Sequence, residues 1–135
     1  MSKDNILKVT VTILFTLGAL YTEKIGLSIP LYYYNPNWST VFGVPMVVIV
    51  GWVILDHLAW FMYRRVGLIA GFTPLCIDFV LEFLAHNLEW WTWILPAPQF
   101  TVFGAPALNY VTYVVWGFTS IWLCKGLGVK SKVRR

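Results

Sequence analysis

A row of ionisable side chains lies within one apolar stretch of the sequence. Asp78, Glu82 and His86 follow one another at intervals of four residues, which places them on one face if the segment is helical. Glu89 continues the row three residues later. Carboxyl groups that are close together and poorly hydrated favour the protonated form, so at least one is expected to keep its proton at pH 7. A neutral proton donor beside an ionised acceptor is the pairing that general acid–base catalysis requires.

Two other interpretations of this row remain open. In the first, the acids form a structural polar seam, binding histidine, asparagine or tyrosine side chains of neighbouring helices. In the second, Glu82 and His86 share a metal ion, because residues four apart on a helix lie side by side. The chain has only two histidines, His57 and His86, which are few for a di-iron site. The sequence pattern therefore favours a site without a metal ion.

The composition indicates a membrane protein. Of 135 residues, 59% are hydrophobic and 12% are charged, whereas about a quarter of a soluble domain is charged. The net charge is +4, but five of the ten basic residues lie in the tail 125–135. Such a tail suits anionic lipid headgroups better than nucleic acid, which is not an expected partner.

Four segments approach the length of about 20 apolar residues that a spanning helix needs. These segments are 6–22, 44–63, 67–87 and 106–123. The predicted fold is therefore an all-α membrane protein of one domain, with about four transmembrane helices. Asp56 and Asp78 then lie near the middle of the membrane. Since a carboxylate at the bilayer centre costs roughly 3 kcal/mol, both are expected to face the interior of the bundle.

The basic residues also predict an orientation. They lie near the N-terminus, in the turn after the second helix and in the tail, at Lys3, Lys8, Arg64, Arg65 and 125–135. The only basic residue in the loops 24–43 and 88–105 is Lys24. By the positive-inside rule, both termini of this multi-pass protein are expected on the cytoplasmic side of the cell membrane. The two outer loops are rich in Tyr and Trp, which an aromatic belt at the membrane interface explains without any function.

One short motif occurs twice. Residues 41–45, Val-Phe-Gly-Val-Pro, correspond to residues 102–106, Val-Phe-Gly-Ala-Pro. An aromatic residue lies ten positions before each Phe-Gly, and a carboxylate, Glu23 or Glu82, precedes each aromatic cluster. We therefore expect two helix-pair repeats related by an axis along the membrane normal, with a binding site at their interface.

In this order, the motifs resemble the carotenoid biosynthesis membrane family that includes the bisanhydrobacterioruberin hydratases (carotenoid 1,2-hydratases), in a shortened form. The first block of similarity consists of Glu23-Lys24-Ile25-Gly26, the aromatic residues 32–34, Gly43-Val44-Pro45 and Trp52. The second block consists of Asp78, Glu82, Trp91-Thr92-Trp93, Gly104-Ala105-Pro106 and Asn109-Tyr110. The similarity extends from Glu23 to beyond Trp116.

The resemblance implies the addition of water to a terminal isoprenoid double bond through a carbocation, without a cofactor. Asp78 and Glu82 are then the first candidates for acid–base catalysis, and Asp56 and Glu23 are the next. The implied residues for binding the substrate are Tyr34, Trp91, Trp93, Asn109 and Trp52. The expected ligand is a lipid or carotenoid, and the chain is expected to form a homo-oligomer or to bind partner membrane subunits.

Two competing functions use the same residues. In a non-catalytic subunit of a larger membrane complex, the intramembrane acids bind helices of partner chains. In a small transporter or proton relay, the acid row conducts protons. A hydratase differs from both in needing a lipid-accessible cavity that ends at the carboxylates.

Overall fold

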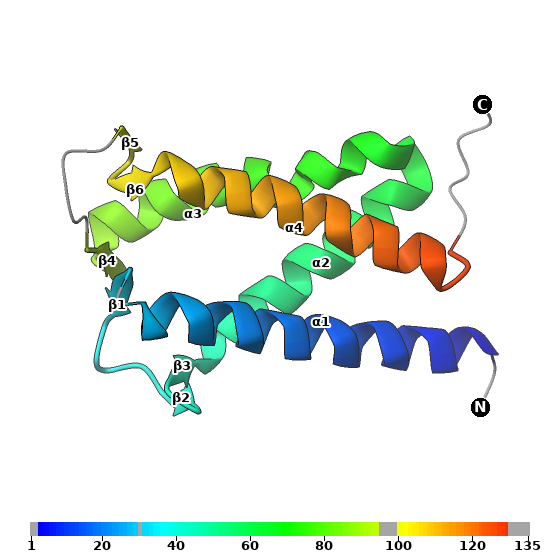
Figure 1. The fold of residues 1–135 in the computed structure, drawn as a ribbon, viewed down its shortest axis with the longest axis horizontal. Coiled ribbons are helices and arrows are strands. Elements are labelled where there is room, and N and C mark those ends of the chain that lie inside the picture. The colour runs from blue at the N-terminus through cyan, green and yellow to red at the C-terminus, as the bar shows by residue number, and fades with distance from the viewer. Residues whose placement is uncertain (1–2, 30, 95–99, 130–135) are drawn as a thin grey trace.

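The computed structural model describes residues 3–29, 31–94 and 100–129. Helices occupy all four segments predicted to be helical, as Figure 1 shows. They are α1 (Lys3–Ser28), α2 (Met46–Val66), the 3₁₀ helix η1 (Gly67–Phe72) continued by α3 (Thr73–Leu88), and α4 (Ala107–Gly126). Most of the predicted basic tail, 130–135, lies outside the described residues.

Two stretches of the described residues, Ile6–Ser28 and Met46–Leu88, are long and apolar enough to cross a membrane. The second contains α2, η1 and α3, so it is interrupted by a reversal of the chain. Gly67 ends α2 with a φ of 73°, a conformation that costs glycine little because it lacks a Cβ atom. The chain then returns through η1 into α3, which packs beside α2 and α4 (Figure 1).

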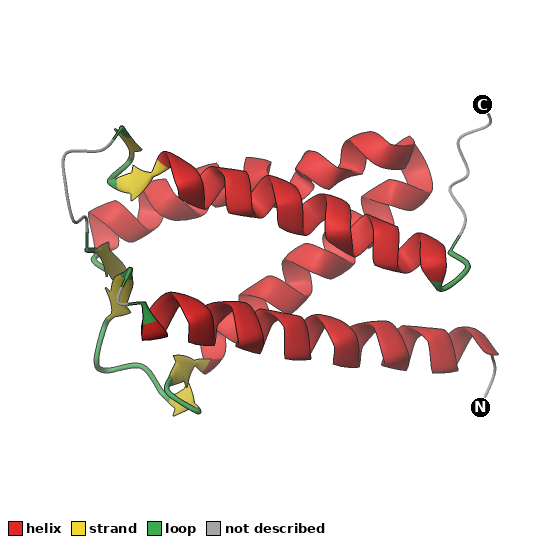
Figure 2. Cartoon of the chain, viewed as in Figure 1, coloured by secondary structure: helices red, strands yellow, loops and turns green. Residues whose placement is uncertain are grey.

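The described residues are mostly helical, as predicted, but they also form six short strands that gather at one end of the bundle (Figure 2). They are β1 (Tyr32–Tyr34), β2 (Thr40–Val41), β3 (Val44–Pro45), β4 (Trp91–Trp93), β5 (Thr101–Val102) and β6 (Ala105–Pro106). The start of α1 and the end of α4 lie on the opposite side of the bundle from the strands (Figure 1). These strands were not predicted because a strand of two or three residues is too short to show a periodic pattern in the sequence.

The repeated Phe-Gly pairs form two-residue hairpin turns. Strands β2 and β3 pair across Phe42-Gly43, and β5 and β6 pair across Phe103-Gly104. All four turn residues have positive φ, at 51° and 81° in the first turn and at 50° and 79° in the second. Positive φ at both central residues is the geometry that suits the twist of a tight hairpin. Each hairpin leads directly into a helix, so it sets where α2 and α4 begin.

The helix boundaries differ from prediction at two places that affect the candidate residues. Helix α1 continues to Ser28 rather than ending near residue 22, so Glu23 lies inside a helix. The segment after Gly67 is 3₁₀ until Phe72 and becomes α only at Thr73. A 3₁₀ helix rises about 2.0 Å per residue instead of about 1.5 Å, so Asp78 lies further along its helix than the sequence predicted.

The apolar core fills the end of the bundle opposite the strands. Its buried residues come from α1, α2, η1, α4 and the segment after α4, and they are Val11, Phe15, Trp60, Tyr63, Ala70, Ile121, Cys124 and Val129. Helix α1 reaches this core through positions four residues apart, Val11 and Phe15, and the same buried stripe continues to Ala19 and Glu23. One face of α1 therefore extends from the apolar core to the polar end.

Helix α4 approaches η1 very closely at Gly117. A Cβ atom at this position would lie 2.1 Å from the carbonyl oxygen of Gly71, whereas one at Gly51 of α2 would meet no atom within 4 Å. We predict that Gly117→Ala lowers the melting temperature of the purified protein in detergent, because α4 must move away from η1. Gly51→Ala, the matched control, should leave the melting temperature unchanged or slightly raised. Equal melting temperatures for the two variants would contradict this packing.

Candidate functional site

Glu23 is buried among hydrogen-bond donors from three elements. The hydroxyl groups of Tyr32 and Tyr34 donate to its Oε2 atom at 2.6 and 2.5 Å. The indole Nε1 of Trp52, on α2, donates to Oε1. Only 5% of Glu23 is exposed, so these donors replace the water that the carboxyl group loses on burial.

Glu82, on α3, is surrounded in the same way by different donors. The indole nitrogens of Trp91 and Trp93 donate to its Oε2 atom at 3.2 and 3.1 Å. The Asn109 side-chain amide, on α4, donates to Oε1 at 2.9 Å. The strand donors come nine and eleven residues after the carboxylate in both cases. Two phenols and one indole N–H thus surround Glu23, and three N–H groups surround Glu82.

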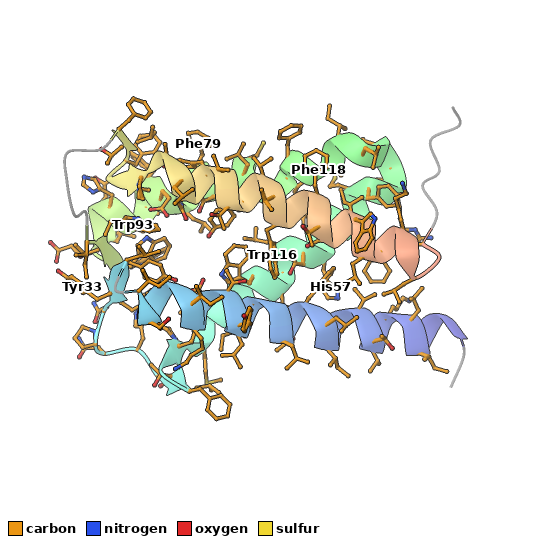
Figure 3. All side chains as sticks on the ribbon, in the orientation of Figure 1. Tyr33, His57, Phe79, Trp93, Trp116 and Phe118 are labelled. Atoms are coloured by element: carbon orange, nitrogen blue, oxygen red, sulfur yellow. The ribbon has the colours of Figure 1, made fainter. Side chains whose placement is uncertain are left out.

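A two-stranded ribbon joins these two groups of donors. Strands β1 and β4 pair antiparallel, with Tyr32 opposite Trp93 and Tyr34 opposite Trp91. Because side chains alternate along a strand, Tyr32 and Tyr34 share one face and Tyr33 lies on the other. The ring centroids of Tyr32 and Trp93 are 5.0 Å apart in an edge-to-face arrangement. Figure 3 shows Trp93 at the strand end of the bundle.

A cavity of about 300 Å³ lies beneath the ribbon, between α1 and α4. Both Glu23 and Glu82 line it, together with all six of these donor residues. The other lining residues are mainly apolar and come from α1, α4 and the ends of the strands: Thr22, Ile25, Gly26, Leu31, Ile94, Pro106, Leu108, Thr112 and Tyr113. Both carboxyl groups therefore face one small aromatic chamber.

The inner end of the chamber is closed by stacked rings. Trp52 of α2 and Tyr113 of α4 stack with centroids 4.6 Å apart and an interplanar angle of 10°. Trp116 meets Trp52 edge to face at 5.6 Å. A Cβ atom on Gly18 would lie 2.7 Å from the Trp116 ring, so the Trp116 side chain of α4 packs directly on α1 at this level. Figure 3 shows Trp116 about half-way along the bundle.

The two tyrosines that bind Glu23 are held in the protonated form. Burial first, and then the neighbouring Glu23 carboxyl group, raise the pKa of Tyr32 well above its ordinary value, and the same causes act more strongly on the pKa of Tyr34. Both phenols therefore keep their protons throughout the neutral range, and they remain available as hydrogen-bond donors.

The predicted catalytic residues are divided between two places. Glu23 and Glu82 line the cavity, and Asp78 lies directly behind its wall, with Oδ2 accepting a hydrogen bond from Asn109 at 3.1 Å. The same Asn109 amide binds Glu82, so it bridges the two acids of α3. The prediction that Asp78 and Glu82 share an inward face of one helix agrees with their burial, at 0% and 2% exposed.

Asp56 does not join this cluster. Its Oδ1 atom accepts hydrogen bonds from Trp116 Nε1 at 2.8 Å and from Ser120 Oγ at 2.6 Å, and it is fully buried between α2 and α4. Asp56 is absent from the residues that line the cavity. It comes four residues after Trp52, one helical turn beyond the stacked rings, so the structure makes it a link between two helices.

The buried part of this row ends at Glu82. His86 and Glu89 are exposed, whereas Glu82 is buried. Within the described ranges, no group of three or more His, Cys, Asp or Glu side chains is placed to hold a metal ion. The Glu82–His86 pair that suggested a metal site thus has no third ligand in this part of the chain.

All five residues predicted to bind a substrate lie at the cavity: Tyr34, Trp52, Trp91, Trp93 and Asn109. Sequence reasoning missed Tyr113, which stacks on Trp52 and interacts electrostatically with Glu23, Asp78 and Glu82. Four of the loop aromatics that a membrane-interface belt could also explain line the cavity, and Tyr32 is the one among them that was not predicted to bind substrate. The strands that carry these aromatics are three residues long, too short to give a periodic signal in the sequence.

Comparisons with protein-family models, with curated proteins and with solved structures give no match to this chain.

The hydrogen bonds to Glu23 lead to a prediction about stability. Tyr32→Phe removes one donor from the buried Glu23 carboxyl group, and loss of a hydrogen-bond partner by a buried polar group costs about 1–3 kcal/mol. We expect the free energy of unfolding in mixed micelles to fall by that amount. Tyr33→Phe is the matched control, since Tyr33 is 56% exposed on the opposite face of β1. Equal stability of the two variants would show that Tyr32 does not support Glu23.

Proposed function

We propose that this protein is a membrane-embedded hydratase that adds water to the terminal double bond of an isoprenoid chain such as a carotenoid. One observation carries the proposal: two carboxyl groups with different hydrogen-bond partners line one aromatic cavity. The resemblance of the sequence motifs to the carotenoid hydratase family supports the same reaction, because the residues that carry this resemblance include Glu23, Glu82 and the donors around them.

The donors around each carboxyl group assign its role. Indole and amide N–H groups donate hydrogen bonds but do not accept them. Glu82 has only such partners among the described residues, so a proton on it would face another donor, and these three hydrogen bonds favour its ionised form. A phenol oxygen both donates and accepts. Glu23 therefore keeps satisfied hydrogen bonds with Tyr32 and Tyr34 whether or not it carries a proton.

The reaction then divides between the two carboxyl groups. Protonated Glu23 gives its proton to the less substituted carbon of the double bond, and a tertiary carbocation forms at the other carbon. A water molecule attacks this cation, and Glu82 accepts the proton that the water loses. Return of that proton from Glu82 to Glu23, through water or the phenols, restores the enzyme. The net change is the addition of one water molecule.

The cavity walls suit the cationic intermediate. The rings of Trp52, Trp91, Trp93 and Tyr113 line the space between the two acids. A cation over a desolvated aromatic face is stabilised by about 2 kcal/mol. An apolar wall also limits the number of water molecules near the cation, which reduces loss of a proton to form a rearranged alkene.

The substrate is proposed to reach the cavity from the lipid, between α1 and α4. The rim on this side carries apolar side chains that are exposed in the isolated chain: Ile25 and Leu31 at 42% and 37%, and Ile94 and Leu108 at 43% and 69%. A volume of about 300 Å³ is at the lower limit for pockets that hold a drug-sized ligand. It therefore holds one end of a polyene, and the remaining chain lies along the α1–α4 side.

The same proposal includes the membrane arrangement. We propose that α1, α2, α3 and α4 all cross the bilayer, with both termini in the cytoplasm and the strands on the outer side. The matching donor spacing at Glu23 and Glu82, and the matching hairpins at Phe42 and Phe103, support two helix-pair repeats. The ribbon β1–β4 then lies across the pseudo-twofold axis.

A structural subunit of a larger membrane complex is the second candidate, and one observation favours it. Both cavity carboxyl groups already have three donors each, so the network holds α1, α2, α3 and α4 together without a ligand. In that case the cavity would hold lipid and no reaction would follow.

Expression in a host that makes lycopene distinguishes the two candidates. We expect a new pigment heavier than lycopene by the mass of one water molecule. Glu23→Gln and Glu82→Gln should each reduce its yield about 100-fold or more, since acid–base groups contribute about 10²–10⁴ to the rate. Glu89→Gln is the control, because this exposed carboxylate is outside the cavity. No product from folded wild-type protein would favour the structural role, and unchanged yield in both cavity variants would exclude the assigned acids.

Cysteine labelling in intact cells tests the arrangement in the membrane. In a background lacking Cys76 and Cys124, a cysteine at Asn37 should react with a membrane-impermeant maleimide, because this exposed loop residue lies at the strand end. A cysteine at Arg64, exposed at the end of α2, should react only after the cells are opened. The reverse pattern would show that the termini face outward.

A further inference from the structure

The cavity combines negative charge with aromatic walls and has no basic side chain in its lining. Among the described residues that form it, none is Lys, Arg or His. Lys24 follows Glu23 in the sequence, but its ammonium group donates to the Phe42 carbonyl oxygen at 3.0 Å instead. The donors on Glu82 are neutral, so the charge of this carboxylate is solvated by dipoles and is not balanced by a cation.

Asp78 lies behind Glu82 in the cavity wall and, within the described part of the chain, adds another acidic group without a basic partner. Asp78 is fully buried, and its Oδ1 atom has no hydrogen-bond partner among the described residues. Asp78 and Glu82 share the single Asn109 amide as a donor. Tyr113 lines the same cavity as Glu23 and Glu82. A positive charge placed beside Tyr113 would be attracted by each of these carboxyl groups that is ionised, and Glu82 is the one that the proposed mechanism leaves ionised.

We propose that this cavity binds lipophilic organic cations, with a quaternary ammonium or protonated tertiary amine beside Glu82 and the aromatic faces of Trp91, Trp93 and Tyr113. Aromatic rings and a carboxylate are the groups that recognise an ammonium whose methyl groups prevent hydrogen bonding. The apolar rim between α1 and α4 accommodates the hydrophobic substituent. A small hydrated metal ion is a poor occupant, since ring faces offer it no oxygen ligands.

This binding does not depend on hydration activity. An ammonium ion would also compete with a carbocation for the same position, so it would inhibit the reaction if the protein is a hydratase. Binding without any hydration would leave the present inference intact and remove the proposed function. Hydration without ammonium binding would remove only the present inference.

The test measures binding of radiolabelled benzyltrimethylammonium to the full chain in lipid nanodiscs, with empty nanodiscs as background. We expect saturable binding, and Glu82→Gln should lower the affinity about tenfold or more, because it removes the charge and keeps the shape. Asp56→Asn is the matched control, since Asp56 is an equally buried carboxyl group outside the cavity, and its effect should stay within about twofold. Melting curves of both variants establish that they fold.

A comparison on the wild-type protein alone tests the proposal without any variant. The carbon isostere of the probe, 2,2-dimethylpropylbenzene, has the same shape and no charge. It should bind about tenfold more weakly or worse, because it lacks the charge-dependent attraction. Absence of saturable ammonium binding, equal affinity of the two probes, or equal affinity of wild type and Glu82→Gln would each overturn the proposal.

Discussion

The burial of carboxyl groups in an apolar bundle is the constraint on which the rest of this structure depends. A buried carboxyl group without partners is strongly unfavourable, so each one requires donors from nearby chain segments. Glu23 obtains them from β1 and α2, and Glu82 obtains them from β4 and α4. These hydrogen bonds connect α1, α2, α3 and α4 to the ribbon, directly or through the two carboxyl groups. The strand end of the molecule is organised around acids, and the opposite end around an apolar core.

The same requirement explains why strands occur in an otherwise helical chain. The donors must be presented on one face, two residues apart, and a strand does this directly because its side chains alternate. Pairing of β1 with β4 then satisfies backbone N–H and C=O groups of both strands. The ribbon serves both as the roof of the cavity and as the source of its polar groups. A helix with the same residues would have directed these donors to different sides.

The different hydrogen-bond donors around Glu23 and Glu82 distinguish the two carboxyl groups of the cavity. Phenol donors leave Glu23 free to exist with or without a proton, whereas N–H donors keep Glu82 as an acceptor. Two similar carboxyl groups thereby acquire different properties without any basic residue in the lining. Asp56 shows the contrast, since its partners Trp116 and Ser120 bind it between α2 and α4, away from the cavity. Burial of an acid alone does not make an active site; an adjoining space is also needed.

The sequence by itself determined the positions of the four helical segments, because long apolar runs are a local property of the chain. It also determined that Asp78 and Glu82 face inward, since their four-residue spacing defines one helical face. Only the tertiary structure decided which residues meet the acids. Trp52 binds Glu23 from 29 residues away, and Asn109 binds Glu82 from 27 residues away. The ribbon joins Tyr32 to Trp93, and the stacking of Trp52 on Tyr113 closes the cavity. Such contacts depend on how helices cross and how strands pair, which the periodicity within one segment does not specify.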